Sequence, residues 1–106
     1  MTVTAAEVTV TAADVLRDAM ELITPEGAWI QHSAYRWRPP GYCAGSAIDI
    51  TADDLDARDL DQDARRAFEQ AVGCENIPKW NDDPSRIHED VLLAFKRAIE
   101  IAEDSQ

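Results

Sequence analysis

The chain has 106 residues, of which 45% are hydrophobic, and it carries a formal net charge of −11 at pH 7. A chain of this length is expected to fold as one globular domain with a modest core. The charge argues against direct nucleic-acid binding, whose affinity comes largely from basic groups that neutralise phosphates, and it favours a basic protein partner. No apolar run approaches the length of a membrane span, so a cytoplasmic protein with no membrane partner is expected.

The N-terminus contains a short tandem repeat. The sequence of residues 2–8, TVTAAEV, recurs in residues 9–15 as TVTAADV. The first copy begins with β-branched residues in which polar threonine and apolar valine alternate. Residues 1–10 are therefore interpreted as an N-terminal tail or an edge strand, and residues 11–103 as a single globular domain.

The second copy of the repeat has the features of a helix start. Thr11 is a suitable N-cap, and Asp14 three residues later completes a variant of the capping box. Apolar residues then recur on one face, which predicts a helix over residues 12–23. Pro25 ends this helix, because the residue before a proline disfavours the helical conformation.

Residues 26–42 are irregular and rich in aromatic side chains, although a short strand is considered over residues 28–33. Aromatic rings beside arginines could form an anion- or base-binding surface in this acidic chain. The alternative is that the rings cover the core while the arginines pair with acidic residues. The candidates here for contact with a partner are Trp29, Tyr35, Arg36, Trp37 and Arg38.

Cys43 opens the next predicted helix. A thiol in the first turn of a helix lies near the positive end of the helix dipole, which favours the thiolate. A catalytic cysteine would suit this position, with His32 or His88 as its base and Asn81 or Asp82 orienting the imidazole ring. The alternative is that Cys43 is a small buried core residue.

Two possible metal sites are rejected, a zinc site on the spacing of its ligands and a calcium loop on its residue types. Structural zinc sites contain a closely spaced ligand pair, whereas the two cysteines and two histidines all stand more than ten positions apart. Asp59, Asp61 and Asp63 imitate the opening of a calcium loop, but Ala64 and Gln70 stand where that loop needs Gly and Glu. No metal, no cofactor and no disulfide is expected.

Residues 49–63 form an acid-rich segment. The candidates in it for contact with a partner are Asp53, Asp54 and Asp56; the alternative is a solvated acidic face. The end of the segment predicts a helix over residues 62–72, with Asp59 or Asp61 as its N-cap and Gly73 as its C-terminal stop.

The segment of residues 77–86 is expected to form a rigid structural turn. Pro84 fits the first position of a helix, and Asp83 before it is a suitable N-cap. Apolar residues at spacings of three and four then predict one long helix over residues 84–103. The turn residues are Trp80, Asn81, Asp82 and Pro84.

Two stretches resemble a family of small uncharacterised bacterial and bacteriophage proteins. One is Trp80-Asn81-Asp82 with Pro84, Arg86 and the pattern Val91-Leu92-x-x-Phe95-x-x-Ala98-Ile99; the other is Cys43-Ala44-Gly45-Ser46-Ala47-Ile48. The resemblance covers about residues 12–101. The family pattern has Thr at the position of Ile87. The resemblance implies a shared fold unit and a bacterial or phage origin, but no activity.

These signals together predict a mainly α fold. It is a small four-helix domain with a long C-terminal helix as its spine and room for a minor short β element. The predicted helices cover residues 12–23, 43–50, 62–72 and 84–103.

The leading functional hypothesis is a small acidic protein-interaction module, encoded by a phage and acting on a host protein. The absence of a recognisable catalytic set favours a binding protein over an enzyme. One alternative is a thiol-dependent enzyme or small-ligand-binding protein centred on Cys43. A second is an acidic mimic of nucleic acid. The sequence leaves open whether the chain forms a homo-oligomer.

Overall fold

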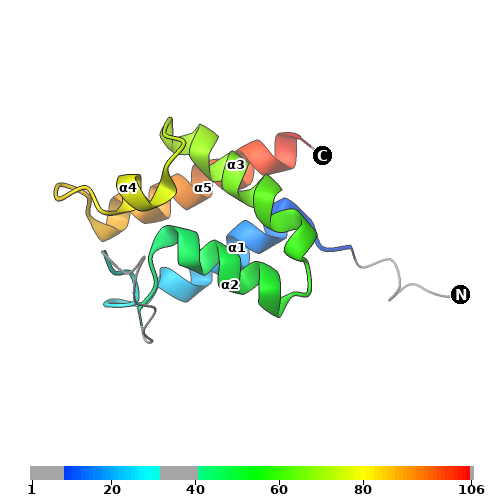
Figure 1. The fold of residues 1–106 in the computed structure, drawn as a ribbon, viewed down its shortest axis with the longest axis horizontal. Helices are drawn as coiled ribbons and strands as arrows, with labels where there is room; N and C mark the ends of the chain where they lie inside the picture. The colour runs from blue at the N-terminus through cyan, green and yellow to red at the C-terminus, as the bar shows by residue number, and fades with distance from the viewer. Residues whose placement is uncertain (1–8, 32–40, 106) are drawn as a thin grey trace, which may run out of the picture.

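The computed structural model describes residues 9–31 and 41–105. These residues form five α-helices without a sheet, and α5 is the longest (Figure 1). The prediction of a mainly α fold with a long C-terminal helix is confirmed. The elements are α1 (Ala12–Ile23), α2 (Ala44–Asp54), the short 3-10 helix η2 (Arg58–Leu60), α3 (Asp61–Val72), α4 (Ile77–Asn81) and α5 (His88–Asp104).

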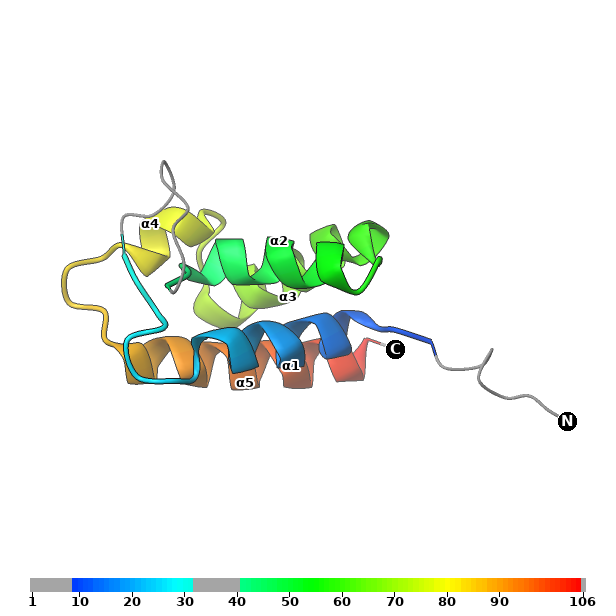
Figure 2. The ribbon, with the colours of Figure 1, turned by 90° about the horizontal axis from the view of Figure 1, so that it is seen from below.

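The helices form two layers around a small apolar core. Figure 2 shows α1 and α5 together in one layer, with α2, α3 and α4 in the other. Phe68 of α3 lies at the centre of the core, with its ring centroid 4.8 Å from that of Phe95 and 5.4 Å from that of Trp80. Within the described ranges, none of the helices has the length and apolar character needed to cross a membrane.

Helix α1 begins as the sequence predicts. The backbone N–H of Asp14 donates to Thr11 Oγ1 at 3.2 Å, and the backbone N–H of Thr11 donates to Asp14 Oδ2 at 3.0 Å. This reciprocal pair is the expected capping box. The first copy of the repeat, residues 2–8, lies outside the described residues, and so does most of the expected tail or edge strand over residues 1–10.

Helix α2 is longer than predicted, because it continues to Asp54 where the sequence pattern suggested an end near Ile50. The chain then reverses at Asp56, whose φ of +53° is a left-handed conformation that aspartate tolerates better than most residues.

Helix α3 ends as predicted, at Gly73 with a φ of +68°. The expected N-cap, Asp59 or Asp61, is wrong. Leu60 occupies the N-cap position, and Asp61 is already the first helical residue, held there by Arg65 one turn later.

The predicted turn around Trp80 contains a fifth helix that the sequence did not indicate. Trp80 and Asn81 are the last two residues of α4, and only the residues after them form the turn. Asn76 caps this helix by accepting a hydrogen bond from the backbone N–H of Lys79 at 3.0 Å. Five residues are too short a span for apolar periodicity to reveal a helix.

Helix α5 starts four residues later than predicted, so the expectation that Asp83 is its N-cap and Pro84 its first residue is wrong. Asp83 Oδ1 instead accepts hydrogen bonds from the N–H and hydroxyl of Ser85, which lower the pKa of Asp83. The N-cap position belongs to Ile87, the position at which the family pattern has Thr. Ile87 donates its N–H to Asp90 Oδ2 at 3.1 Å, but its side chain offers no acceptor in return.

Among the described residues, the minor β element takes the form of a parallel bridge between Trp29 and Tyr42. The N–H of Ile30 donates to the Tyr42 carbonyl at 3.1 Å, and the N–H of Tyr42 donates to the Ala28 carbonyl at 2.8 Å. Gly41 is required beside this bridge, because a Cβ there would overlap Ile30 Cγ2. The described part of the expected strand over residues 28–33 is therefore not a regular strand.

Candidate functional site

Asn81 is fully buried, and its side-chain amide makes four hydrogen bonds. Its Oδ1 accepts from Trp29 Nε1 at 2.6 Å and from the backbone N–H of Ala44 at 3.0 Å. Its Nδ2 donates to the Ile30 carbonyl at 3.1 Å and to Asp82 Oδ1 at 3.0 Å. The amide thereby satisfies both of its donors and both of its acceptor positions. We call Asn81 and these contacts the Asn81 hub.

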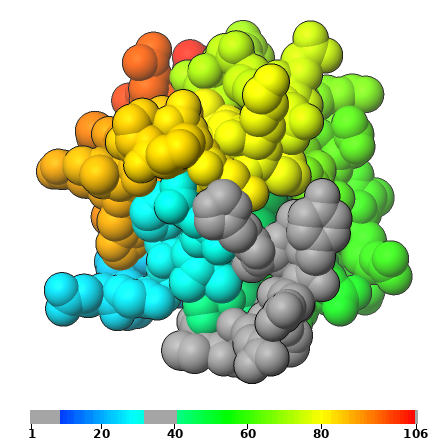
Figure 3. Space-filling view, turned by 60° about the vertical axis from the view of Figure 1, so that its left-hand side comes forward, coloured from blue at the N-terminus to red at the C-terminus, as the bar shows by residue number. Residues whose placement is uncertain are grey.

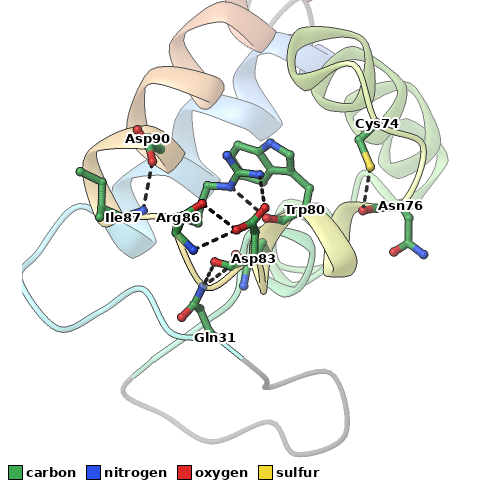
Figure 4. A network of polar contacts seen from close by, with 10 residues as sticks. Gln31, Cys74, Asn76, Trp80, Asp83, Arg86, Ile87 and Asp90 are labelled. Atoms are coloured by element: carbon green, nitrogen blue, oxygen red, sulfur yellow. Dashed lines mark hydrogen bonds and ion pairs between the residues drawn. The ribbon is translucent and has the colours of Figure 1, made fainter.

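The segment around Asn81 receives further contacts from Gln31 and from Arg86 (Figure 4). Gln31 Nε2 donates to the backbone carbonyls of Asn81 at 3.0 Å and of Asp83 at 2.8 Å. Arg86 Nε donates to the Trp80 carbonyl at 3.0 Å, and its guanidinium lies 4.0 Å from the centroid of the Trp80 ring. Figure 3 shows the result, with the segment before residue 32 packed against the segment that follows α3.

His88 joins the two helices of one layer. Its Nε2 contacts the carbonyl of Ile23 at the end of α1, and its ring stacks on Trp29 with a centroid separation of 6.1 Å. Trp29 is thus held by both Asn81 and His88. These contacts support the interpretation that the Trp29 ring covers the core, although Trp29 is also a candidate for contact with a partner.

Cys43 is the N-cap of α2 and only 4% exposed. Its Sγ accepts from the backbone N–H of Ser46 at 3.4 Å and lies 3.2 Å from the hydroxyl of Ser46. The expected base, His88, contacts Ile23 instead, and the amide of Asn81 is committed to the hub. The described contacts therefore do not bring together the thiol, base and orienting residue, while His32 lies outside the described residues.

The second thiol, Cys74, is half-buried and donates to the carbonyl of Asn76 at 3.5 Å (Figure 4). Both cysteines are free. Across residues 9–31 and 41–105, no group of three His, Cys, Asp or Glu side chains is placed to hold a metal ion.

Part of the acid-rich segment is neutralised by Arg65 of α3. Its Nε and Nη2 donate to the two oxygens of Asp49 at 3.1 and 2.8 Å, and its Nε lies 3.5 Å from Asp61 Oδ2. The other oxygen of Asp61 is shielded from solvent and accepts no hydrogen bond from any described residue. Burial, followed by the hydrogen bond and charge of Asp49, raises the pKa of Asp61.

The predicted partner-binding aspartates at the end of α2 are all exposed. Asp53 lies 3.8 Å from Arg58, and both side chains are open to solvent. Asp54 and Asp56 make no ion pair with a described residue. The other candidates of this class, Tyr35, Arg36, Trp37 and Arg38, lie outside the described residues.

Two surface hollows lie on opposite sides of α2. The first, of about 620 Å³, lies between α2 and the start of α3 and is lined by Asp49, Ile50, Ala52, Asp53, Arg58 and Asp61. The second, of about 380 Å³, lies between α1 and α2 and is lined by Asp18, Glu21, Leu22, Thr51, Asp54 and Leu55. Carboxylates border both hollows. Among the described residues, an arginine lines the first hollow and none lines the second.

Comparison with protein families shows to which family the chain belongs. Residues 7–101 match the model of DUF6197, a family of unknown function. The chain belongs to this family. The DUF6197 match spans α1 to α4, the Asn81 hub and α5 as far as Ile101. Comparisons with curated proteins and with solved structures gave no significant match.

Sequence reasoning missed two features of this DUF6197 domain. It placed Asn81 in a turn without foreseeing its contacts with residues 28–31, and it treated Leu22 only as part of an apolar face. A usable signal for the second hollow was present. Asp18 and Glu21 stand four and one positions before Leu22, which places a carboxylate beside an apolar side chain at the edge of α1.

Proposed function

We propose that this DUF6197 protein is a small acidic interaction module that binds a basic region of another protein through the surface around α2. The observation that supports this proposal is the uneven pairing of the carboxylates there. Arg65 and Arg58 face Asp49, Asp61 and Asp53, while Asp54 and Asp56 have no such partner among the described residues. Exposed, unpaired carboxylates on a chain with a net charge of −11 attract basic surfaces and accelerate association with them.

The proposal includes a cytoplasmic location, a phage origin and a host protein as the partner. Its support for origin is the resemblance of the two sequence stretches to bacterial and phage proteins. A role in imitating nucleic acid is less favoured, because the aspartates of the acidic segment border different hollows. Asp53 lines the first and Asp54 the second, and Asp63 lines a third between α1, α3 and α5.

The experiment is affinity capture of a partner with two matched triple variants. In the test variant, Asp53→Asn, Asp54→Asn and Asp56→Asn remove three charges from the end of α2. Asparagine suits the left-handed backbone at residue 56. In the control variant, Glu89→Gln, Glu100→Gln and Asp104→Asn remove three charges from exposed positions of α5.

A partner captured by the wild type and by the α5 control, but lost with the α2 variant, is the expected result. Its binding, measured with the purified proteins, should weaken as the salt concentration rises, because salt screens exposed charges. Capture that is equally strong with both variants and insensitive to salt would contradict the proposal.

A further inference from the structure

The hollow between α1 and α2 is built symmetrically by the two helices. Helix α1 contributes Asp18, Glu21 and Leu22, and helix α2 contributes Thr51, Asp54 and Leu55. Both sets have the spacing i, i+3, i+4, so each set lies on one edge of its helix. The two edges face one another across a hollow of about 380 Å³.

The floor of this hollow is suited to an apolar side chain. Leu22 and Leu55 pack against the core but remain partly exposed, and Thr51 between them is only 4% exposed. Covering the exposed parts of two leucines would remove apolar surface from water, which is favourable in proportion to the area covered.

The rim of the hollow is negatively charged and not neutralised from within the described chain. Asp18, Glu21 and Asp54 are exposed, and none of them pairs with a described basic residue. The hollow on the other side of α2 differs in this respect, because Arg58 lines it and Arg65 holds two of its carboxylates. The rim carboxylates are not grouped as metal ligands in the described structure.

We infer that this hollow receives one apolar side chain of a basic partner segment, with Lys or Arg residues on either side of that side chain pairing with Asp18, Glu21 and Asp54. The inference rests on the proposed function and adds the site and the recognition pattern. Complementary charge selects the occupant: carboxylates repel phosphate groups and acidic surfaces, and the apolar floor gives no advantage to a bare polycation.

The test uses the full chain and a synthetic helical peptide in which one Leu has a Lys one turn before it and another one turn after it. A Leu→Ser version of the peptide has the same charge, and spermine serves as a polycation without an apolar side chain. Binding is followed by NMR through the backbone amide shifts of Leu22, Thr51 and Leu55. The Leu peptide should shift these amides and bind about tenfold more tightly than the Ser peptide or spermine.

Two double variants then separate this inference from the proposed function. Asp18→Asn with Glu21→Gln removes two charges from the rim, and Asp53→Asn with Asp56→Asn removes two charges outside it. The first should weaken binding of the Leu peptide about tenfold, and the second should weaken it much less. All four positions are exposed, so the variants should retain the wild-type circular dichroism spectrum.

Three outcomes would overturn the inference. The first is equal binding of the Leu and Ser peptides, and the second is equal effects of the two double variants. The third is that the Leu peptide does not shift the backbone amides of Leu22, Thr51 and Leu55. Equal effects of the variants would leave the acidic surface as a general attractor of basic partners, as the proposed function states. Capture of a partner that neither double variant weakens would overturn the proposed function as well.

Discussion

Trp29 and Asn81, 52 positions apart in the sequence, are joined by a hydrogen bond of 2.6 Å between the indole Nε1 and the amide Oδ1. The same Oδ1 accepts the first backbone N–H of α2, from Ala44. One buried side chain therefore connects the loop after α1, the start of α2 and the end of α4. These are the elements that position the surface around α2.

Replacing Asn81 with Ala should lower the free energy of unfolding by about 3 kcal/mol or more, because several buried polar groups lose their partner and each costs about 1–3 kcal/mol. Urea denaturation gives the value. Asn76→Ala is the control, since it removes an exposed N-cap of α4 and should cost about 1 kcal/mol. Similar losses for the two variants would show that Asn81 is not a central structural contact.

Replacing Ile87 with Thr should stabilise the protein by about 1 kcal/mol. Residue 87 has the extended backbone of an N-cap, and Asp90 already accepts its N–H, so a threonine hydroxyl would complete the capping box. Ile87 is 55% exposed and loses little burial in the exchange. Thermal denaturation beside Ile87→Val, which supplies no acceptor, tests this; equal melting temperatures for the two variants would refute it.

Asp61 should make stability depend on pH. Its pKa in the folded protein is raised from the ordinary value of 3.8, first by burial and then by Asp49. A raised folded pKa means that the contribution of this group to stability is present below the unfolded pKa and is lost as pH rises through the folded pKa. Asp61→Asn should therefore gain stability relative to the wild type as pH increases from about 4 to 7.

Urea denaturation across that pH range measures the effect. Asp49→Asn is the informative control, because it removes the bidentate partner of Arg65 and should lower stability at pH 7. A constant difference between Asp61→Asn and the wild type at every pH would contradict the account of Asp61.

The two thiols should react at different rates in the folded protein. Cys43 is buried at the start of α2 whereas Cys74 is half-buried, so iodoacetamide should modify Cys74 first. Mass spectrometry of partly labelled protein identifies the order, and urea-unfolded protein gives the intrinsic rates. Faster labelling of Cys43 in the folded state would favour the alternative function centred on that thiol.

Local sequence signals predicted the helices whose limits depend on local chemistry. Thr11 and Asp14 mark the start of α1, and Gly73 marks the end of α3, because capping and left-handed glycine are local properties. The start of α5 was misplaced because Asp83 followed by Pro84 suits a helix start and a turn equally well. In the structure, the hydrogen bonds from Ser85 favour the turn.

The candidate site was less predictable because it depends on contacts between distant segments. Composition identified the exposed aspartates Asp53 and Asp54, but it did not show that they line two different hollows. The pairing of Arg65 with Asp49 and the hollow between α1 and α2 both arise from helix packing. The spacing of Asp18, Glu21 and Leu22 marks one edge of α1, but no local pattern shows which edges of two helices will face one another.

The most direct test of the proposed function is the affinity of the captured partner for the wild type and for the Asp53→Asn, Asp54→Asn, Asp56→Asn variant, measured at low and at high salt. We predict that the wild type binds more tightly at low salt and that its affinity falls more steeply as salt increases, because the variant has fewer charges to screen. Equal affinities and equal salt dependence for the two proteins would contradict a binding role for the acidic surface around α2.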